Sequence, residues 1–241
     1  MELSYPYICF DKSDIPEEAF RHLDRHIIES VGGGFSSMFP SFSLVFENAS
    51  RVIENEWGNP KLVLKKGLRE WLCFIVVQSD RGNLFFSLQP EFMDKEGELF
   101  DEDYLMLPTS WRELYRWFNS FCVTEESYCV MDWWNTPFRF EARLDLNEYA
   151  KGVGASKEQV NKCTQIMGCK KEMFRCWLLT ESEDALFINE DACDGKVYYI
   201  NGKDLDNIVE IHDPKKKIDE YLAHYLSGMS PQSFHWLDCI D

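Results

Sequence analysis

The C-terminal part of the chain has the clearest alternation of apolar and polar positions. Two short apolar runs, 176–179 and 185–188, flank a charged turn and predict a β-hairpin. A third run, 197–200, stops at Asn201-Gly202, a dipeptide that supplies turn residues with positive φ, and 208–211 can return as a fourth strand. The pattern therefore predicts a small sheet.

A helix is expected directly after this sheet. Asp213 can cap its start, Pro214 suits its first turn, and Gly228 stands where the helix would end. Apolar residues recur between these positions at helical spacing: Ile218, Tyr221, Leu222, Tyr225 and Leu226. The helix can thus lay one apolar face across the sheet.

The N-terminal part shows helical periodicity first and strand-like runs afterwards. One helix is expected from Asp14 to Val31, where Gly32-Gly33-Gly34 stops it, and a second from about Ser41 to Trp57. A turn at Ser79-Asp80-Arg81-Gly82 should separate the last two of three strands, which are expected at 61–64, 71–77 and 83–88. The predicted order is helix, helix, sheet.

The middle of the chain begins with an acidic stretch, 89–103, which we expect to be an exposed loop. A helix should follow, because Ser110 and Glu113 have the spacing of a capping box. Its apolar stripe would consist of Trp111, Leu114, Tyr115, Phe118 and Phe121. Strands are expected at 129–134 and 138–144.

These elements predict an α+β protein with mixed or antiparallel sheets and packed helices. An N-terminal α+β segment would cover 1–106 and a second α+β part 107–241, with one continuous domain as the alternative. With 241 residues, of which 45% are hydrophobic, the chain can bury a core of its own.

Targeting patterns and cysteine spacing indicate where the protein is located and which state its thiols have. No apolar run is long enough to span a membrane and the first residues lack the pattern of a signal peptide, so we expect a cytoplasmic protein without a membrane partner. The nine cysteines are scattered, odd in number and never spaced as Cys-x-x-Cys. We expect reduced, buried thiols, no metal and no cofactor.

The charge balance is strongly acidic. With 42 Asp and Glu against 25 Lys and Arg, the formal net charge is −17. Such a field attracts basic partners and repels nucleic acids and membrane surfaces, although acidity also serves solubility alone. A basic protein is therefore the expected partner, and nucleic acid is not.

Few patterns in the chain are typical of catalysis or metal binding. His22 and His26 lie four residues apart, a spacing that suits zinc on one helix face, but Leu23 stands where a metalloprotease has its catalytic Glu. Gly32-Gly33-Gly34 follows a helix instead of opening one, which favours a helix stop over a phosphate loop. The chain has no Gly-x-Ser-x-Gly, so we expect a protein that is not an enzyme.

Two acidic turns are candidate partner-binding sites. Carboxylates in turns are usually solvated, and they can also bind a cation, act in acid/base catalysis or meet a basic partner. The candidate residues are Glu181, Glu183, Asp184, Glu190, Asp191 and Asp194.

The segment 148–165 resembles a helix-turn-helix motif, because Ala150, Gly154 and Val160 have the spacing of one. Two short helices are expected here, the second opened by Ser156. As a DNA-binding element it would use Lys157, Gln159, Asn161 and Lys162. The alternative is a helical hairpin packed on the sheet, since the acidity of the chain opposes phosphate binding.

Three motifs resemble the SUKH superfamily. They are Leu107-Pro108-x-x-Trp111-x-x-Leu114, Asp191-x-x-Asp194-Gly195-Lys196-Val197-Tyr198 and Ile218-Asp219-Glu220-Tyr221-Leu222, and the likeness covers at most 107–228. That superfamily includes bacterial immunity proteins of polymorphic toxin systems and fungal cell-wall regulators. The resemblance implies a non-enzymatic binder with an acidic α+β surface that blocks a toxin domain, such as a nuclease. A DNA-binding transcriptional regulator that uses 148–165 is the alternative.

Overall fold

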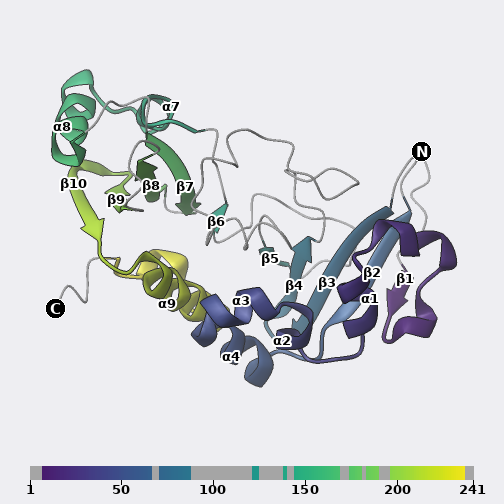
Figure 1. Ribbon diagram of the computed structural model, residues 1–241. Helices are drawn as coiled ribbons and strands as arrows, with labels where there is room; N and C mark the ends of the chain where they lie inside the picture. The colour runs from purple at the N-terminus through teal and green to yellow at the C-terminus, as the bar shows by residue number, and fades with distance from the viewer. Residues whose placement is uncertain are drawn as a thin grey trace.

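The computed structural model describes residues 7–66, 71–87, 121–124, 138–139, 144–168, 174–180, 183–189 and 196–236. In these ranges the chain forms helices and two five-stranded sheets whose neighbouring strands are all antiparallel (Figure 1). The expected α+β class is confirmed. Within the same ranges, every helix is too short or too polar to cross a bilayer.

The first sheet has its strands in chain order. They are β1 (Tyr7–Cys9), β2 (Lys61–Lys66), β3 (Trp71–Ser79), β4 (Gly82–Ser87) and β5 (Phe121–Thr124). Leu62 lies opposite Ile75, and Ile75 lies opposite Phe86, so these three share the sheet face that is buried in the main core. The predicted turn at Ser79–Gly82 is confirmed, and Gly82 adopts a φ of 125° there.

The second sheet also has neighbours that are adjacent in sequence. Its strands are β6 (Phe138–Arg139), β7 (Phe174–Thr180), β8 (Ala185–Asn189), β9 (Val197–Asn201) and β10 (Asp204–Ile211). The predicted hairpin is β7 and β8, and the predicted third and fourth strands are β9 and β10. The short apolar runs and the turn residues between them therefore predicted β7 to β10 of this sheet.

The N-terminal helices are shorter and more numerous than the sequence predicts. They are two 3-10 helices, η1 (Lys12–Asp14) and η2 (Glu17–His22), and then α1 (Arg25–Ser30), α2 (Phe35–Met38), α3 (Pro40–Val45) and α4 (Glu47–Glu56). The expectation of one helix over 14–31 is wrong. Asp24 is extended and its carboxylate accepts a hydrogen bond from the His26 amide at 2.7 Å, so a new helix begins at Arg25.

The single helix expected over 41–57 is also wrong, because the chain turns at Phe39 and again at Phe46. Their ψ values of 62° and 72° are not helical. Phe35, Phe39 and Phe42 all pack on Phe86 of the sheet, with ring centroids 5.1, 5.3 and 6.3 Å away. The turn at Phe39 lies directly before Pro40, whose ring disfavours helical backbone at the preceding residue.

Helices of the C-terminal part cover both faces of the second sheet. They are α7 (Leu146–Gly152), α8 (Lys157–Met167) and α9 (Pro214–Leu226), followed by the short 3-10 helix η5 (Pro231–Ser233). α7 and α8 lie on one face and α9 on the other (Figure 1). Two predicted caps are confirmed: Ser156 and Gln159 form a capping box, and Asp213 accepts a hydrogen bond from the Lys216 amide.

The largest hydrophobic cluster joins the two sheets. It holds the helix-facing residues of the first sheet together with α9 and with Leu178, Leu186 and Val197 of the second sheet. A second cluster lies between α7, α8 and the opposite face of the second sheet, where Phe174 and Phe187 are buried. Thus segments on both sides of residue 106 contribute to one core.

Several predictions concern the middle of the chain. The acidic loop at 89–103, the helix expected at Ser110 and the strand at 129–134 lie outside the described residues. Phe121 is the first residue of β5, so its assignment to a helical stripe is wrong. Of the strand expected at 138–144, Phe138–Arg139 form β6, Leu144 is not part of a strand, and 140–143 lie outside the described residues.

Candidate functional site

The predicted acidic turn between β7 and β8 is built tightly on its neighbours. Glu183 is exposed and has a φ of 66°, while its backbone carbonyl accepts a hydrogen bond from the Tyr149 hydroxyl of α7 at 2.6 Å. The Glu183 amide donates to the carbonyl of Thr180 at 3.1 Å. Hydrogen bonds to Tyr149 and Thr180 therefore hold the backbone of Glu183, while its carboxylate is exposed to solvent.

Asp184 has a structural role in the same turn. It is half-buried, and its carboxylate accepts a hydrogen bond from the Gly202 amide at 3.2 Å. Burial raises the pKa of Asp184 above the ordinary aspartate value, because water no longer solvates the charge fully. Of the six predicted acidic residues, Glu183 and Asp184 are described, whereas Glu181, Glu190, Asp191 and Asp194 lie outside the described residues.

Gly202 explains why the two hairpin turns lie so close together. A Cβ at this position would lie 2.5 Å from the carbonyl oxygen of Glu183. Gly202 is not among the glycines with positive φ, so the reason predicted for glycine here, a left-handed turn residue, is wrong. The position requires glycine because the backbone of Glu183 lies where a side chain would begin.

The helix pair expected at 148–165 is present as α7 and α8, with Gly154 at a φ of 73° in the turn. Two of the four candidate DNA-binding side chains already have partners within the protein. Gln159 caps its own helix, and Lys162 forms an ion pair of 2.6 Å with Asp206 of β10. Lys157 and Asn161 are exposed on α8.

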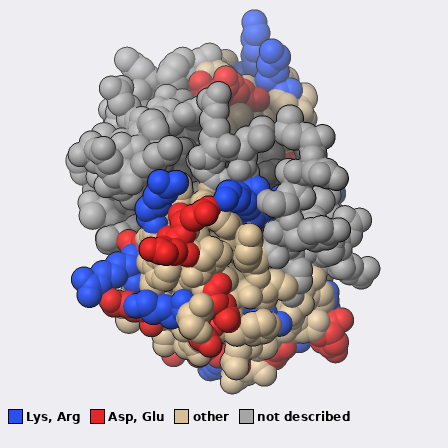
Figure 2. All heavy atoms as spheres, turned by 90° about the vertical axis from the view of Figure 1, so that its right-hand side faces the viewer, with Lys and Arg blue, Asp and Glu red and all other residues tan. Residues whose placement is uncertain are grey.

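Charges of both signs intermingle on the described surface. Figure 2 shows Lys and Arg beside Asp and Glu on the face that carries β1 and α1. Two ion pairs lie in the N-terminal part: Lys66 of β2 pairs with Glu18 of η2, and Arg25 pairs with Glu29 within α1, each at 2.7 Å. The described surface therefore has no large area of one sign on this face.

β1 and the residue after it, Phe10, expose an apolar patch at the edge of the first sheet. Tyr7, Ile8 and Phe10 are 46%, 36% and 59% exposed, although all three are large apolar side chains. Neighbouring residues partly cover two of the rings: Trp71 lies 5.5 Å from Tyr7, and the Lys61 ammonium lies 5.5 Å from Phe10. Exposed apolar residues on an edge strand are typical of surfaces that contact other chains.

A buried carboxylate connects the two ends of the chain. Asp219 of α9 accepts hydrogen bonds from the backbone amides of Asn48 and Ala49 at 2.9 and 2.8 Å, and from the Asn48 side chain at 2.8 Å. These amides lie in the first turn of α4, where helix donors lack partners in the helix itself. Burial raises the pKa of Asp219, and the three hydrogen bonds oppose that rise.

The C-terminal end of α9 is held in a similar way. The indole of Trp57 donates to the carbonyl of Leu226 at 3.2 Å, and the Arg81 guanidinium donates to the same oxygen. Arg81 also pairs with Glu56 and lies over the Trp57 ring, 5.9 Å from its centroid. α9 is therefore held at its middle, through Asp219, and at its C-terminal end, through Leu226.

An open groove of about 560 Å³ lies between α4 and α9, and the segment after α9 forms part of its lining. Its apolar lining includes Val52, Phe234 and Met229, and Met229 is 54% exposed. Glu56 and Glu220 line it from the two opposing helices. The groove combines apolar side chains with groups of both charges, because Glu56 pairs with Arg81, Glu220 pairs with Lys217, and Arg51 lies on the α4 wall.

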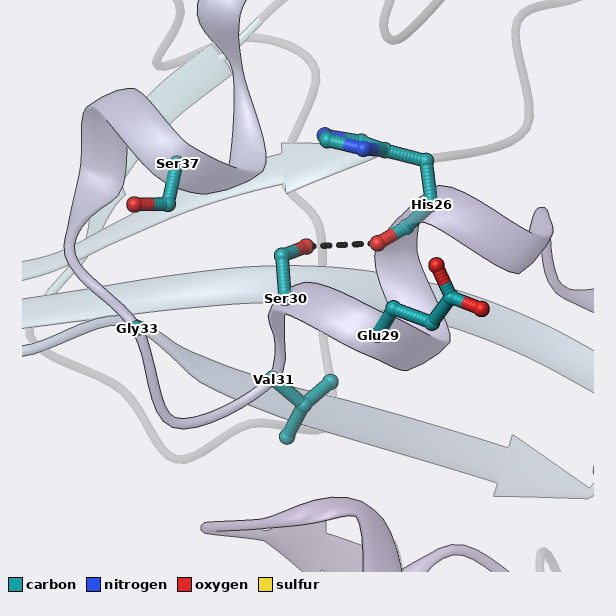
Figure 3. A pocket seen from close by; sticks show the side chains of 6 residues that line it. All are labelled: His26, Glu29, Ser30, Val31, Gly33 and Ser37. Atoms are coloured by element: carbon teal, nitrogen blue, oxygen red, sulfur yellow. Dashed lines mark hydrogen bonds between the residues drawn. The ribbon is translucent and has the colours of Figure 1, made fainter.

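A smaller hollow of about 390 Å³ lies between α1 and α2 (Figure 3). Imidazole, carboxylate and hydroxyl groups of His26, Glu29 and Ser37 surround it, as Figure 3 shows. The Ser30 hydroxyl donates to the His26 carbonyl at 2.8 Å, and Glu29 pairs with Arg25. These two groups therefore serve the helix itself.

The metal-binding spacing considered for His22 and His26 is not realised as one helix face. His22 ends η2, and His26 lies in α1 beyond the break at Asp24. Among the described residues, no group of three or more His, Cys, Asp and Glu side chains could hold a metal ion. Four cysteines in these ranges are buried and unbonded to one another: Cys9, Cys73, Cys163 and Cys176.

Comparison of the chain with protein-family models, with curated proteins and with solved structures found no match. The acidic turn at Glu183 was accessible to sequence reasoning because charged residues separate two apolar runs. The α4–α9 groove was not, because its two walls come from segments about 170 residues apart, as the Ala49–Asp219 contact illustrates.

Proposed function

We propose that the chain is a non-enzymatic acidic binding protein that neutralises a basic toxin domain by direct contact, in the manner of an immunity protein. The observation that carries this proposal is the net charge of −17. A strongly negative chain associates faster with a positively charged partner, and it repels acidic proteins and nucleic acids. The likeness of three sequence motifs to the SUKH superfamily supports the same class of function.

Glu183 supports this proposal on the structural side. Its carboxylate is exposed, while hydrogen bonds to Tyr149 and Thr180 hold its backbone. Because the backbone is already held, binding of a basic side chain has to order only the Glu183 side chain. Asp184 contributes differently, because its hydrogen bond to Gly202 keeps the turn in place.

The test is co-expression with the product of the adjacent gene, followed by measurement of association rates for the purified pair. Association should be fast at low salt and slow as ionic strength rises toward physiological values, where the Debye length is about 8 Å. Glu183→Gln should lower the association rate without changing stability. Glu158→Gln on α8 is the matched control for loss of one exposed carboxylate.

A product that is harmless, or equally toxic in the presence of this protein and not bound by it, would refute the immunity function. Equal rates for Glu183→Gln and wild type would instead remove Glu183 from the interface and leave the function standing. The two results are distinguishable because the first measures toxicity and the second measures kinetics.

A second candidate function is DNA binding by α7 and α8, which is favoured by the presence of the two helices and by the exposure of Lys157 and Asn161. The Lys162–Asp206 ion pair weakens it, because a phosphate would have to displace a carboxylate. Electrophoretic mobility shift of a DNA fragment at about 50 mM salt tests it. A salt-sensitive shift that Lys157→Gln weakens would establish this function over the first.

A further inference from the structure

The segment after α9, residues 229–236, folds back along this helix as a strap. The chain leaves α9 at Gly228, whose φ of 83° allows the reversal. Trp236 then reaches the main core, where it is 6% exposed. Its ring stacks on Tyr199 of β9 with centroids 5.8 Å apart, and it lies 4.9 Å from the ring of Tyr221 in α9. The strap therefore covers tyrosines of two different elements.

Phe234 of the strap packs along one stripe of α9. The rings of Tyr221 and His224 meet it edge to face, with centroids 5.2 and 5.4 Å away. The Lys217 ammonium lies over the same ring, 5.1 Å from its centroid. Residues 217, 221 and 224 are spaced so that they share one face of a helix. The strap therefore lies lengthwise on α9.

His224 also holds the backbone of the strap. Its Nε2 lies 3.0 Å from the carbonyl oxygen of Ser230 and 2.9 Å from the hydroxyl of Ser233. A carbonyl oxygen only accepts hydrogen bonds, so this nitrogen carries a proton and donates it. The amide and the hydroxyl of Ser233 donate to the same carbonyl, at 2.9 and 2.7 Å. One imidazole of α9 is thus joined to a turn that is closed within the strap.

The strap is attached differently from the rest of the core. Strands such as β8 and β9 are joined by a ladder of backbone hydrogen bonds. Between described residues, the backbone hydrogen bond formed by 230–236 is internal, from the Ser233 amide to the Ser230 carbonyl. Side chains therefore attach this part of the strap to α9 and β9. Parts of a protein that lack such backbone ladders open at lower free energy than the whole fold.

We propose that the strap is a cover that opens as a unit while the rest of the protein stays folded, and that His224 is the residue that latches it. Opening removes the part of the α4–α9 groove that Met229 and Phe234 line, and it uncovers the rings of Tyr199 and Tyr221. A ligand of the uncovered surface binds only the open form, so the closed strap lowers its apparent affinity. This inference does not depend on the proposed function.

Native-state proteolysis of the full chain tests the opening, with chymotrypsin as the protease and mass spectrometry to locate the cuts. Chymotrypsin cleaves after aromatic residues, so an open strap is cut at Phe234 and Trp236. These cuts should precede all others in the described residues. Their rate should change little with urea below the unfolding transition, because opening the strap exposes little surface.

Two variants test the latch. His224→Leu keeps an apolar side chain without a donor and should raise the rate of these cuts about fivefold, the effect of losing one hydrogen-bond donor. His224→Gln keeps an N–H group close to the position of Nε2, so its rate should stay within about twofold of wild type. His212→Leu, which replaces an exposed histidine before α9, is the matched control and should leave the rate at the wild-type value.

The wild-type measurement alone can overturn the opening. If the cuts at Phe234 and Trp236 come no earlier than cuts in β8 and β9, or depend on urea as steeply, the strap opens only when the whole protein unfolds. If the cuts come early but His224→Leu and His224→Gln give equal rates, the strap opens as a unit and His224 is not its latch.

Discussion

Asp219 and Ala49 are separated by 170 positions, and the carboxylate of the first accepts a hydrogen bond from the backbone amide of the second at 2.8 Å. The contact places a side chain of α9 at the N-terminus of α4. It satisfies helix donors that would otherwise be buried without partners. Together with the hydrogen bonds of Trp57 and Arg81 to the Leu226 carbonyl, it holds α9 in place.

Asp219→Ala should lower the free energy of unfolding by about 2 to 3 kcal/mol, because it leaves two backbone amides and the Asn48 side chain without their charged acceptor. Urea denaturation measures the change. Asp213→Ala is the control, since that residue caps α9 at the surface and should cost about 1 kcal/mol. Equal losses in the two variants would contradict the role given to Asp219.

The stability of the protein should depend on pH through Asp219 and Asp184. Burial raises the pKa of each carboxyl in the folded state above its value in the unfolded chain. The folded state then holds the proton more tightly, so this stabilisation is complete below the unfolded pKa and is lost as pH rises through the folded pKa.

The measurement compares wild type with the Asp184→Asn and Asp219→Asn variants by urea denaturation between about pH 4 and pH 7. The free energy of unfolding of wild type, relative to each variant, should fall as pH rises. A relative stability that stays constant or increases over this range would show that the hydrogen bonds outweigh burial.

Gly202→Ala should be strongly destabilising, because its Cβ would lie 2.5 Å from the carbonyl oxygen of Glu183 and backbone atoms cannot move aside cheaply. We expect a loss of about 2 to 3 kcal/mol, as for other small-to-large changes at close contacts. Gly152→Ala provides the matched control. It lies in α7 with nothing within 4 Å of the added methyl, so it should be neutral or stabilise by up to about 1 kcal/mol.

Phe86→Ala should cost about 3 to 5 kcal/mol, because this buried ring is the one on which Phe35, Phe39 and Phe42 all pack. Leu44→Ala on α3 should change the stability by less than about 0.5 kcal/mol, since Leu44 is 87% exposed. Thermal or urea unfolding distinguishes the two. A large loss at Leu44 would mean that α3 faces the other way.

The buried thiols should be inert in the folded protein. Burial raises the pKa of Cys73 to about 12 and the pKa values of Cys9 and Cys163 to about 11, so the reactive thiolate is scarce near neutral pH. Alkylation at about pH 8 followed by peptide mass spectrometry should find these three cysteines unmodified, and modified after denaturation in urea. All nine cysteines of the denatured chain should react without prior reduction.

Several confirmed predictions concern contacts between near neighbours. The β7–β8 hairpin, the cap of α9 at Asp213 and the capping box of Ser156 and Gln159 follow from residues a few positions apart. The residues that form these three features are close together in the sequence, so the pattern of apolar and capping residues predicted them.

Contacts between segments far apart in the chain could not be predicted from such local patterns. Phe35, Phe39 and Phe42 pack on Phe86, which belongs to a strand far along the chain. Lys162, a candidate DNA-binding residue, is ion-paired within the protein because β10 places Asp206 beside it. Asp219 lies beside the apolar stripe of α9, and nothing in the sequence pattern indicates that it is buried. It is buried because α4 packs against α9 at this position. A carboxylate's surroundings, and with them its pKa and its role, are set by packing between segments that local periodicity cannot relate.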